Sequence, residues 1–212
     1  MGIANTTRER ILDAGLAMAS QSGLEAVTLG VLASNVGMSK SGLFAHFHSK
    51  EAVQLSLLEH SDRFAVPVVV EPAMKAPEGL PRLRALVTNW FGWAQRAGLP
   101  GGCPVAAGLF EYDDVQGVVH DKILEIEARW RALLTSLVTQ ATARGHLRPD
   151  LDTDQFVWEL FGIYLSHHVS SRFMKSPDAD KRAQTAFAAL LARAGAKETG
   201  KQKRPKPRSK ET

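Results

Sequence analysis

Hydroxyl, ammonium and imidazole groups gather in one short stretch of the chain, between residues 28 and 50. Such groups donate hydrogen bonds or carry positive charge, which suits them to phosphate oxygens and to the edges of nucleic-acid bases. Lys40, Lys50 and the Thr28 hydroxyl suit phosphates. The candidate contacts to DNA are Thr28, Ser39, Lys40, Ser41, Gly42, Phe44, His46 and Lys50.

Two short helices joined by a tight turn would position these side chains. Thr28 can cap the first helix, and Gly37 suits the turn because glycine tolerates left-handed backbone angles. Ser39 can cap the second helix, in which Leu43 and Phe47 lie four residues apart and face the core. The pattern predicts a helix-turn-helix, whose second helix can lie in the DNA major groove. Spacing alone fits an ordinary helical hairpin as well.

A longer pattern favours the first interpretation, because residues 7–51 resemble the N-terminal domain of the TetR family of transcriptional regulators. The matching residues are Arg10, Ile11, Leu12, Ala14, Gly23, Thr28, Leu32, Ala33, Val36, Gly37, Ser39, Leu43, Phe44, His46, Phe47, Ser49, Lys50 and Glu51. The resemblance implies phosphate or base contacts at Thr28, Ser39, Lys40, Phe44, His46 and Lys50. It also implies a homodimer on a palindromic operator in double-stranded DNA, with a small-molecule effector.

The chain departs from the family pattern in the second helix of this motif. Ser41 and Gly42 stand where the family more often has Gly-Thr, and Phe44 replaces the usual tyrosine. Phe44 has no hydroxyl to donate to a phosphate, and Gly42 weakens the helix by about 0.5–1 kcal/mol relative to alanine. Both departures bear on which half-site the protein prefers.

Composition predicts a protein of the cytoplasm with no membrane segment. An apolar content of 44% suffices for a core, and no apolar run is long enough to span a bilayer. The single cysteine, Cys103, excludes an intrachain disulfide and suits a reducing compartment. The net charge of +4 comes from the last residues, which are rich in Lys and Arg, so charge by itself does not indicate DNA binding.

The expected fold class is all-α, an N-terminal helix-turn-helix domain followed by a helical ligand-binding and dimerisation domain. The expected units are residues 1–50, 51–195 and a disordered basic tail over 196–212. Proline at 67, 72 and 77 predicts an irregular linker over 66–79. Apolar periodicity predicts the other helices at 7–22, 49–65, 83–97, 105–112, 118–144, 153–174 and 178–194.

The helix expected at 153–174 is apolar around much of its circumference. Such a helix must bury both faces, so we expect it to form a four-helix dimer interface together with the helix at 118–144. A large monomeric core is the alternative interpretation.

Aromatic residues predict a small-molecule pocket among these helices, although an ordinary core would explain each of them. The candidates are Trp90, Trp93, Phe110, Tyr112, Trp130, Phe161 and Tyr164. Weaker candidates for polar groups in the pocket are Asn89, Gln116, His120, His167 and His168.

Enzymatic function finds little support, and no cofactor or metal is expected. The sequence has no Gly-rich phosphate loop, no G-x-S-x-G elbow, no H-E-x-x-H and no paired-cysteine spacing. One acidic cluster has metal-ligand residue types but is better explained by charges at helix ends: Glu111, Asp113, Asp114, His120 and Asp121. Cys103 precedes a helix start that could lower its pKa, which raises a redox-sensor hypothesis.

These observations predict a sequence-specific DNA-binding regulator, a repressor released from its operator by a small-molecule ligand. The alternative is a helical protein-interaction module without specific DNA binding.

Overall fold

The computed structural model describes residues 6–196, which form helices joined by turns without any strand. The elements are α1 (Thr7–Ser22), α2 (Leu29–Asn35), α3 (Lys40–Phe47), α4 (Lys50–Ala65), the π-helix η1 (Val66–Val70), α5 (Glu71–Met74), α6 (Leu80–Trp90), α7 (Trp93–Arg96), α8 (Pro104–Glu111), α9 (Val118–Ala143), α10 (Thr153–Arg172) and α11 (Ala179–Arg193). This confirms the all-α prediction. Nearly all of the predicted basic tail lies outside the described residues.

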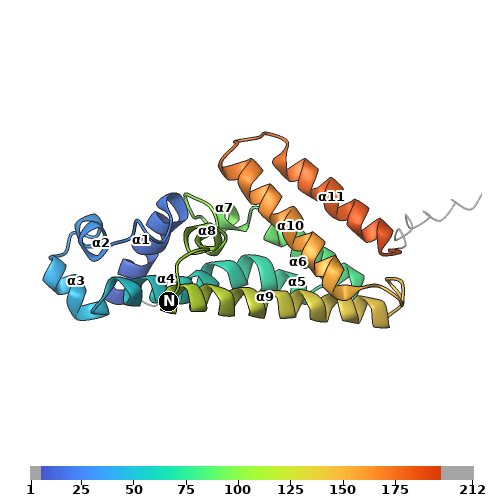
Figure 1. Ribbon diagram of the computed structural model, residues 1–212, viewed down its shortest axis with the longest axis horizontal. Helices are drawn as coiled ribbons and strands as arrows, with labels where there is room; N and C mark the ends of the chain where they lie inside the picture. Colours follow the sequence, from blue (N-terminus) through green and yellow to red (C-terminus); the bar gives the residue numbers. More distant parts are fainter. Residues whose placement is uncertain (1–5, 197–212) are drawn as a thin grey trace, which may run out of the picture.

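The helices form an elongated molecule (Figure 1). α1, α2 and α3 gather at one end, while α4 and α9 run side by side along its length. α10 and α11 form a hairpin that rises from the opposite half. One continuous apolar core passes through all of these elements, from Ile11 in α1 to Leu191 in α11. The end that carries α3 is therefore packed onto the same core as the rest of the chain.

Side-chain caps fix where the N-terminal helices begin. The Thr28 hydroxyl accepts from the Val31 amide at 3.2 Å, and the Ser39 hydroxyl accepts from the Gly42 amide at 3.0 Å. Gly37 has a φ of +69°, in the left-handed region that the tight turn requires. Each cap satisfies an amide that has no partner within its own helix. These features confirm the predicted helix-turn-helix geometry.

The predicted linker over 66–79 is wrong for residues 66–74, which are helical. Pro67 and Pro72 lie at the starts of η1 and α5, but the backbone stays helical from α4 through both, so each proline removes one amide from a continuous hydrogen-bond ladder. The backbone passes them by widening, since the Glu71 amide bonds the Val66 carbonyl five residues back. Turn structure returns around Pro77, where the linker was expected.

The single helix predicted over 83–97 is divided into α6 and α7. Phe91 is extended and Gly92 is left-handed with a φ of +68°, so the chain turns between Trp90 and Trp93. The break places both indoles beside the same cavity. The predicted helices at 7–22, 49–65, 105–112, 118–144, 153–174 and 178–194 are confirmed to within a residue or two at their ends.

α10 does not bury its whole circumference within this chain. It packs on α11 and α9, whereas Trp158 is 67% exposed and Phe173 is 85% exposed. A hydrogen bond of 2.6 Å between the buried His167 and the exposed Asp180 joins α10 to α11. The exposed apolar residues leave one side of this hairpin without a covering element.

Within residues 6–196, no helix is both long enough and apolar enough to cross a membrane.

Candidate functional site

One face of α3 is fully open to solvent and carries most of the predicted DNA contacts. Leu43 and Phe47 are buried beneath it and hold the helix against the core. The side chains that remain exposed are Ser39, Lys40, Ser41, Phe44 and His46, whereas Gly42 is half-buried. A short helix held by its apolar side, with hydroxyl, ammonium and imidazole groups outward, has the arrangement that a major groove accepts.

Phe44 is a prominent group on that face, with half of its surface exposed. Its ring meets the His48 ring edge-on, with centroids 5.9 Å apart. His48 ends α3 in a left-handed conformation with a φ of 60°, which is uncommon for a residue with a side chain. The left-handed backbone at His48 could not be predicted from the sequence, because glycine or asparagine is the usual residue at such a helix end.

Lys50 is held by the protein's own side chains rather than projecting freely. Its ammonium group lies 2.6 Å from Glu25, and the other oxygen of Glu25 accepts from the Tyr112 hydroxyl at 2.7 Å. These hydrogen bonds, first from Lys50 and then from Tyr112, lower the pKa of Glu25. Sequence reasoning missed this cluster, because Glu25 and Tyr112 are far apart along the chain.

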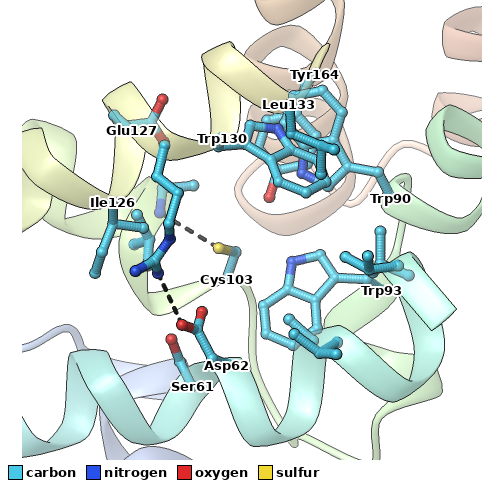
Figure 2. Close-up of a pocket in the computed structure, with 17 residues that line it drawn as sticks. Ser61, Asp62, Trp90, Trp93, Cys103, Ile126, Glu127, Trp130, Leu133 and Tyr164 are labelled. Carbon is cyan, nitrogen blue, oxygen red and sulfur yellow. Dashed lines mark hydrogen bonds and ion pairs between the residues drawn. The ribbon is translucent and has the colours of Figure 1, made fainter. Parts of the chain in front are cut away.

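A second site is an apolar cavity of about 350 Å³ between α4, η1, α6, α7, α8, α9 and α10 (Figure 2). It is lined by Ser61, Asp62, Ala65, Val66, Val69, Val70, Trp90, Trp93, Cys103, Val105, Ala106, Ile126, Glu127, Arg129, Trp130, Leu133 and Tyr164. Asp62 and Arg129 form a half-exposed ion pair of 2.7 Å between α4 and α9. Apolar walls with a few polar groups are typical of small-molecule sites.

Comparison with known proteins assigns the chain to a family. Residues 11–57 match the family described as bacterial regulatory proteins of the tetR family. Residues 79–187, half of the chain, match the tetracyclin repressor-like C-terminal domain. The protein belongs to the TetR family. TetR-family regulators are DNA-binding transcription factors, not enzymes.

Two curated relatives of this TetR-family protein are nucleoid occlusion factors named SlmA. The factor of Cronobacter sakazakii is 30% identical over 84% of this chain and 90% of its own length. That of Sodalis glossinidius is 33% identical over 80% of this chain and 86% of its own.

Solved structures with the same fold include TetR-family regulators from two other bacteria. That of Cytophaga hutchinsonii has a TM-score of 0.77 at 16% identity, covering 93% of this chain and 100% of its own. That of Streptomyces coelicolor has a TM-score of 0.74 at 18% identity, covering 88% and 95%.

The seven aromatic residues predicted for the pocket of this TetR-family chain do not all reach the cavity. Trp90, Trp93, Trp130 and Tyr164 line it. Phe110 is 56% exposed on α8, Tyr112 is buried against Glu25, and Phe161 is buried beneath the Arg131 guanidinium.

The weaker polar candidates lie elsewhere. None of Asn89, Gln116, His120, His167 and His168 lines the cavity. The amide of Asn89 donates to the Val69 carbonyl at 3.3 Å, and His167 bonds Asp180.

Sequence reasoning missed the polar residues of the cavity, above all Glu127. Ile126, Trp130 and Leu133 recur at helical spacing on α9 and face the cavity, and Glu127 interrupts that apolar surface. A charged residue beside an apolar stripe was the available signal. Burial raises the pKa of Glu127 to about 7, although Arg131 opposes the shift.

The prediction that a helix start lowers the pKa of Cys103 is wrong. Its sulfur accepts from the Ala106 amide at 3.4 Å as the cap of α8. Burial dominates over this contact and raises the pKa of the thiol. A thiol held in its neutral form is a poor nucleophile, so the structure does not favour a redox sensor.

The acidic cluster near α8 and α9 takes part in ordinary hydrogen bonds. Glu111 accepts from the Glu25 amide at 3.0 Å, and His120 contacts the neighbouring Asp121 at 3.2 Å. Within residues 6–196, His, Cys, Asp and Glu side chains nowhere converge as a group that could hold a metal ion.

Proposed function

We propose that the protein is a homodimeric repressor that leaves a palindromic operator when a small molecule occupies the cavity. The observation that carries this proposal is the position of α8, which connects the cavity to the DNA-facing end. The residues at the start of α8, Val105 and Ala106, line the cavity. Tyr112, directly after its last residue, contacts Glu25.

α8 is fastened to the N-terminal helices at both ends. Before it, the Gly102 amide donates to the Ser20 carbonyl in α1 at 2.7 Å. After it, Tyr112 and Lys50 share the carboxylate of Glu25. A displacement of α8 by a ligand would therefore move the base of the helix-turn-helix. Coupling of about 1–3 kcal/mol is typical for linked sites and would shift the population toward a form that fits DNA poorly.

The hairpin of α10 and α11 is our proposed dimer interface. A groove along it is lined mainly by small residues, including Gly162, Ala183, Ala186 and Ala189, with exposed Trp158 beside it. Small residues let helices approach closely, and a twofold axis presents the same surface from both protomers. We therefore propose α10 with α11 in place of the expected pairing of 153–174 with 118–144, because α9 packs on α4 and α6 of its own chain.

The proposed division of labour follows the predicted units. Residues 1–50 would read DNA, and residues 51–195 would bind ligand and partner. α4 begins at Lys50 and joins the two.

Selection of bound duplexes from a random DNA pool tests the operator proposal. The expected result is an enriched inverted repeat bound by a dimer. A protein that enriched no sequence and bound DNA only through residues 197–212 would instead be a helical protein-interaction module.

A second candidate function is nucleoid occlusion, which the identity to SlmA proteins over 80–84% of this chain favours. Mapping bound sites along the host chromosome separates the two. A repressor of the kind proposed would be found at promoters, whereas a protein that acts on the nucleoid as a whole would be found along the length of the chromosome.

A further inference from the structure

Two buried polar atoms beside the cavity lack a hydrogen-bond partner within the described residues. They are the Oε2 atom of Glu127 and the indole Nε1 of Trp130, both on α9. The Glu127 side chain is only 14% exposed. A buried polar group without a partner is costly, so a ligand that supplies one gains free energy on binding.

The charges that line the cavity do not balance. Asp62 and Arg129 neutralise each other as an ion pair of 2.7 Å. Cys103 and Tyr164 stay uncharged, because burial raises the pKa of each. Glu127 is the remaining acidic group of the lining, so its ionised form leaves one negative charge.

Arg131 pairs with that carboxylate by charge but forms no hydrogen bond with it. Its Nε atom is 3.8 Å from the Glu127 Oε2, beyond hydrogen-bond distance. Its guanidinium group lies over the Phe161 ring, 4.1 Å from the centroid, outside the lining of the cavity.

Aromatic rings line much of the cavity beside this charge. Trp130 follows Glu127 by three residues on α9, and in Figure 2 the side chains of Trp90 and Trp93 lie to the right of Glu127. Trp90 stacks on Tyr164 with centroids 3.9 Å apart, and Trp130 lies 5.0 Å from Trp90. The faces of such rings attract cations, most strongly where water is excluded.

We propose that the cavity binds a compact organic monocation, a substituted ammonium whose charge faces Glu127 and whose apolar groups pack against the three indoles. The volume of about 350 Å³ sets the size, at the lower end of small-molecule sites. An anion would be repelled by the Glu127 carboxylate, and the cation of the lining, Arg129, is already paired with Asp62. This inference rests on the proposed function only where it concerns release of DNA.

Benzyltrimethylammonium and its uncharged isostere neopentylbenzene form the first test, with phenylacetate as the anion. Trp90, Trp93 and Trp130 line the cavity, so quenching of tryptophan fluorescence in the full-length protein reports binding. We expect the cation to bind at least about tenfold more tightly than the isostere, as a partly desolvated cation–π contact with a counter-charge allows. Equal affinities, or a preference for phenylacetate, would overturn the proposal.

Glu127→Gln tests the counter-charge with little change in shape. We expect this variant to lose most of the preference for the cation and to keep only the part that the indole rings supply, while Glu125→Gln keeps the full preference. Glu125 is the matched control because it lies two residues earlier on α9, more than half exposed and paired with Lys122. Near-ultraviolet circular dichroism shows whether each variant is folded. A folded Glu127→Gln protein whose preference for the cation equalled that of the wild type would refute the role of this carboxylate.

The same reagents separate this inference from the proposed function. If the cation bound but operator binding did not change, the inference about the cavity would be supported, and the cation would not be an effector. Release of operator by the uncharged isostere alone would support the repressor and overturn the inference.

Discussion

The Glu127 carboxyl group ties the stability of the protein to pH. Its pKa is about 7 in the folded chain and near 4.5 when unfolded, because burial disfavours the charged form. Between these values the folded state binds more protons, so this group's contribution to stability falls as the pH rises from about 4.5 to 7. Glu127→Gln removes that dependence.

We therefore predict that Glu127→Gln gains stability over the wild type as the pH rises from 5 to 8. The shift sets an upper bound of about 3 kcal/mol on this gain. Urea unfolding of both proteins at each pH measures it, with Glu125→Gln as the control. A gain that stayed constant with pH would contradict the assigned pKa.

Lys40 tests the DNA-facing surface one residue at a time. Its side chain is exposed on α3, where an ammonium group suits a phosphate. We predict that Lys40→Ala weakens binding to all operator sequences alike and lowers the slope of affinity against salt by about one. Lys75→Ala, exposed at the end of α5, should change neither. A loss of affinity confined to one base position would mean that Lys40 reads a base.

At the scale of the element, α8 can couple the cavity to the N-terminal helices only through the contacts at its two ends, Gly102 with Ser20 and Tyr112 with Glu25. Tyr112→Phe deletes the hydroxyl that bonds Glu25 and keeps the ring. We predict that this change lowers the free energy of unfolding by about 1.5–3 kcal/mol, as for loss of a hydrogen bond to a charged acceptor. Faster amide hydrogen exchange should appear at residues 23–28. Phe110→Leu, exposed on the same helix, is the control; equal exchange in both variants would show that α8 is not coupled to α2.

The sequence predicted the helices well where a cap or glycine marks each end, as Thr28, Gly37 and Ser39 do. It failed at Pro67, because proline forbids an ordinary helix but tolerates the first turn of a wider one. It also missed the break at Gly92, because Trp90 and Trp93 keep helical spacing through the turn.

The candidate sites divide in the same way. Local signals placed Lys40 and His46 on the exposed face of α3, within one helix. The cavity is assembled from seven elements, so apolar spacing identified its indoles but could not place Glu127 or exclude Phe161. Contacts between distant segments, such as that of Tyr112 with Glu25, cannot be predicted from the periodicity of the sequence.

At the scale of the whole molecule, the α10–α11 groove is our proposed dimer interface. We predict that Ala186→Arg yields monomers and weakens operator binding, because the added side chain obstructs close approach of the helices. Ala188→Arg is the matched control, since Ala188 is exposed on α11 and lies outside the groove. Sedimentation velocity measures the oligomeric state of both variants, and titration with operator DNA measures their binding. If the Ala186→Arg protein were still a dimer, the dimer interface would not be this groove.

The residues expected to read DNA and those that line the cavity have no member in common. α8 and the Glu25 cluster link the two sets, because Val105 and Ala106 of α8 line the cavity and Lys50, a predicted DNA contact, pairs with Glu25. Under the proposed function, substitutions in one set would therefore change operator preference and substitutions in the other would change effector preference, so the two could diverge separately among gene copies. A graft of residues 28–50 should then give a hybrid that responds to the same effector at a new promoter.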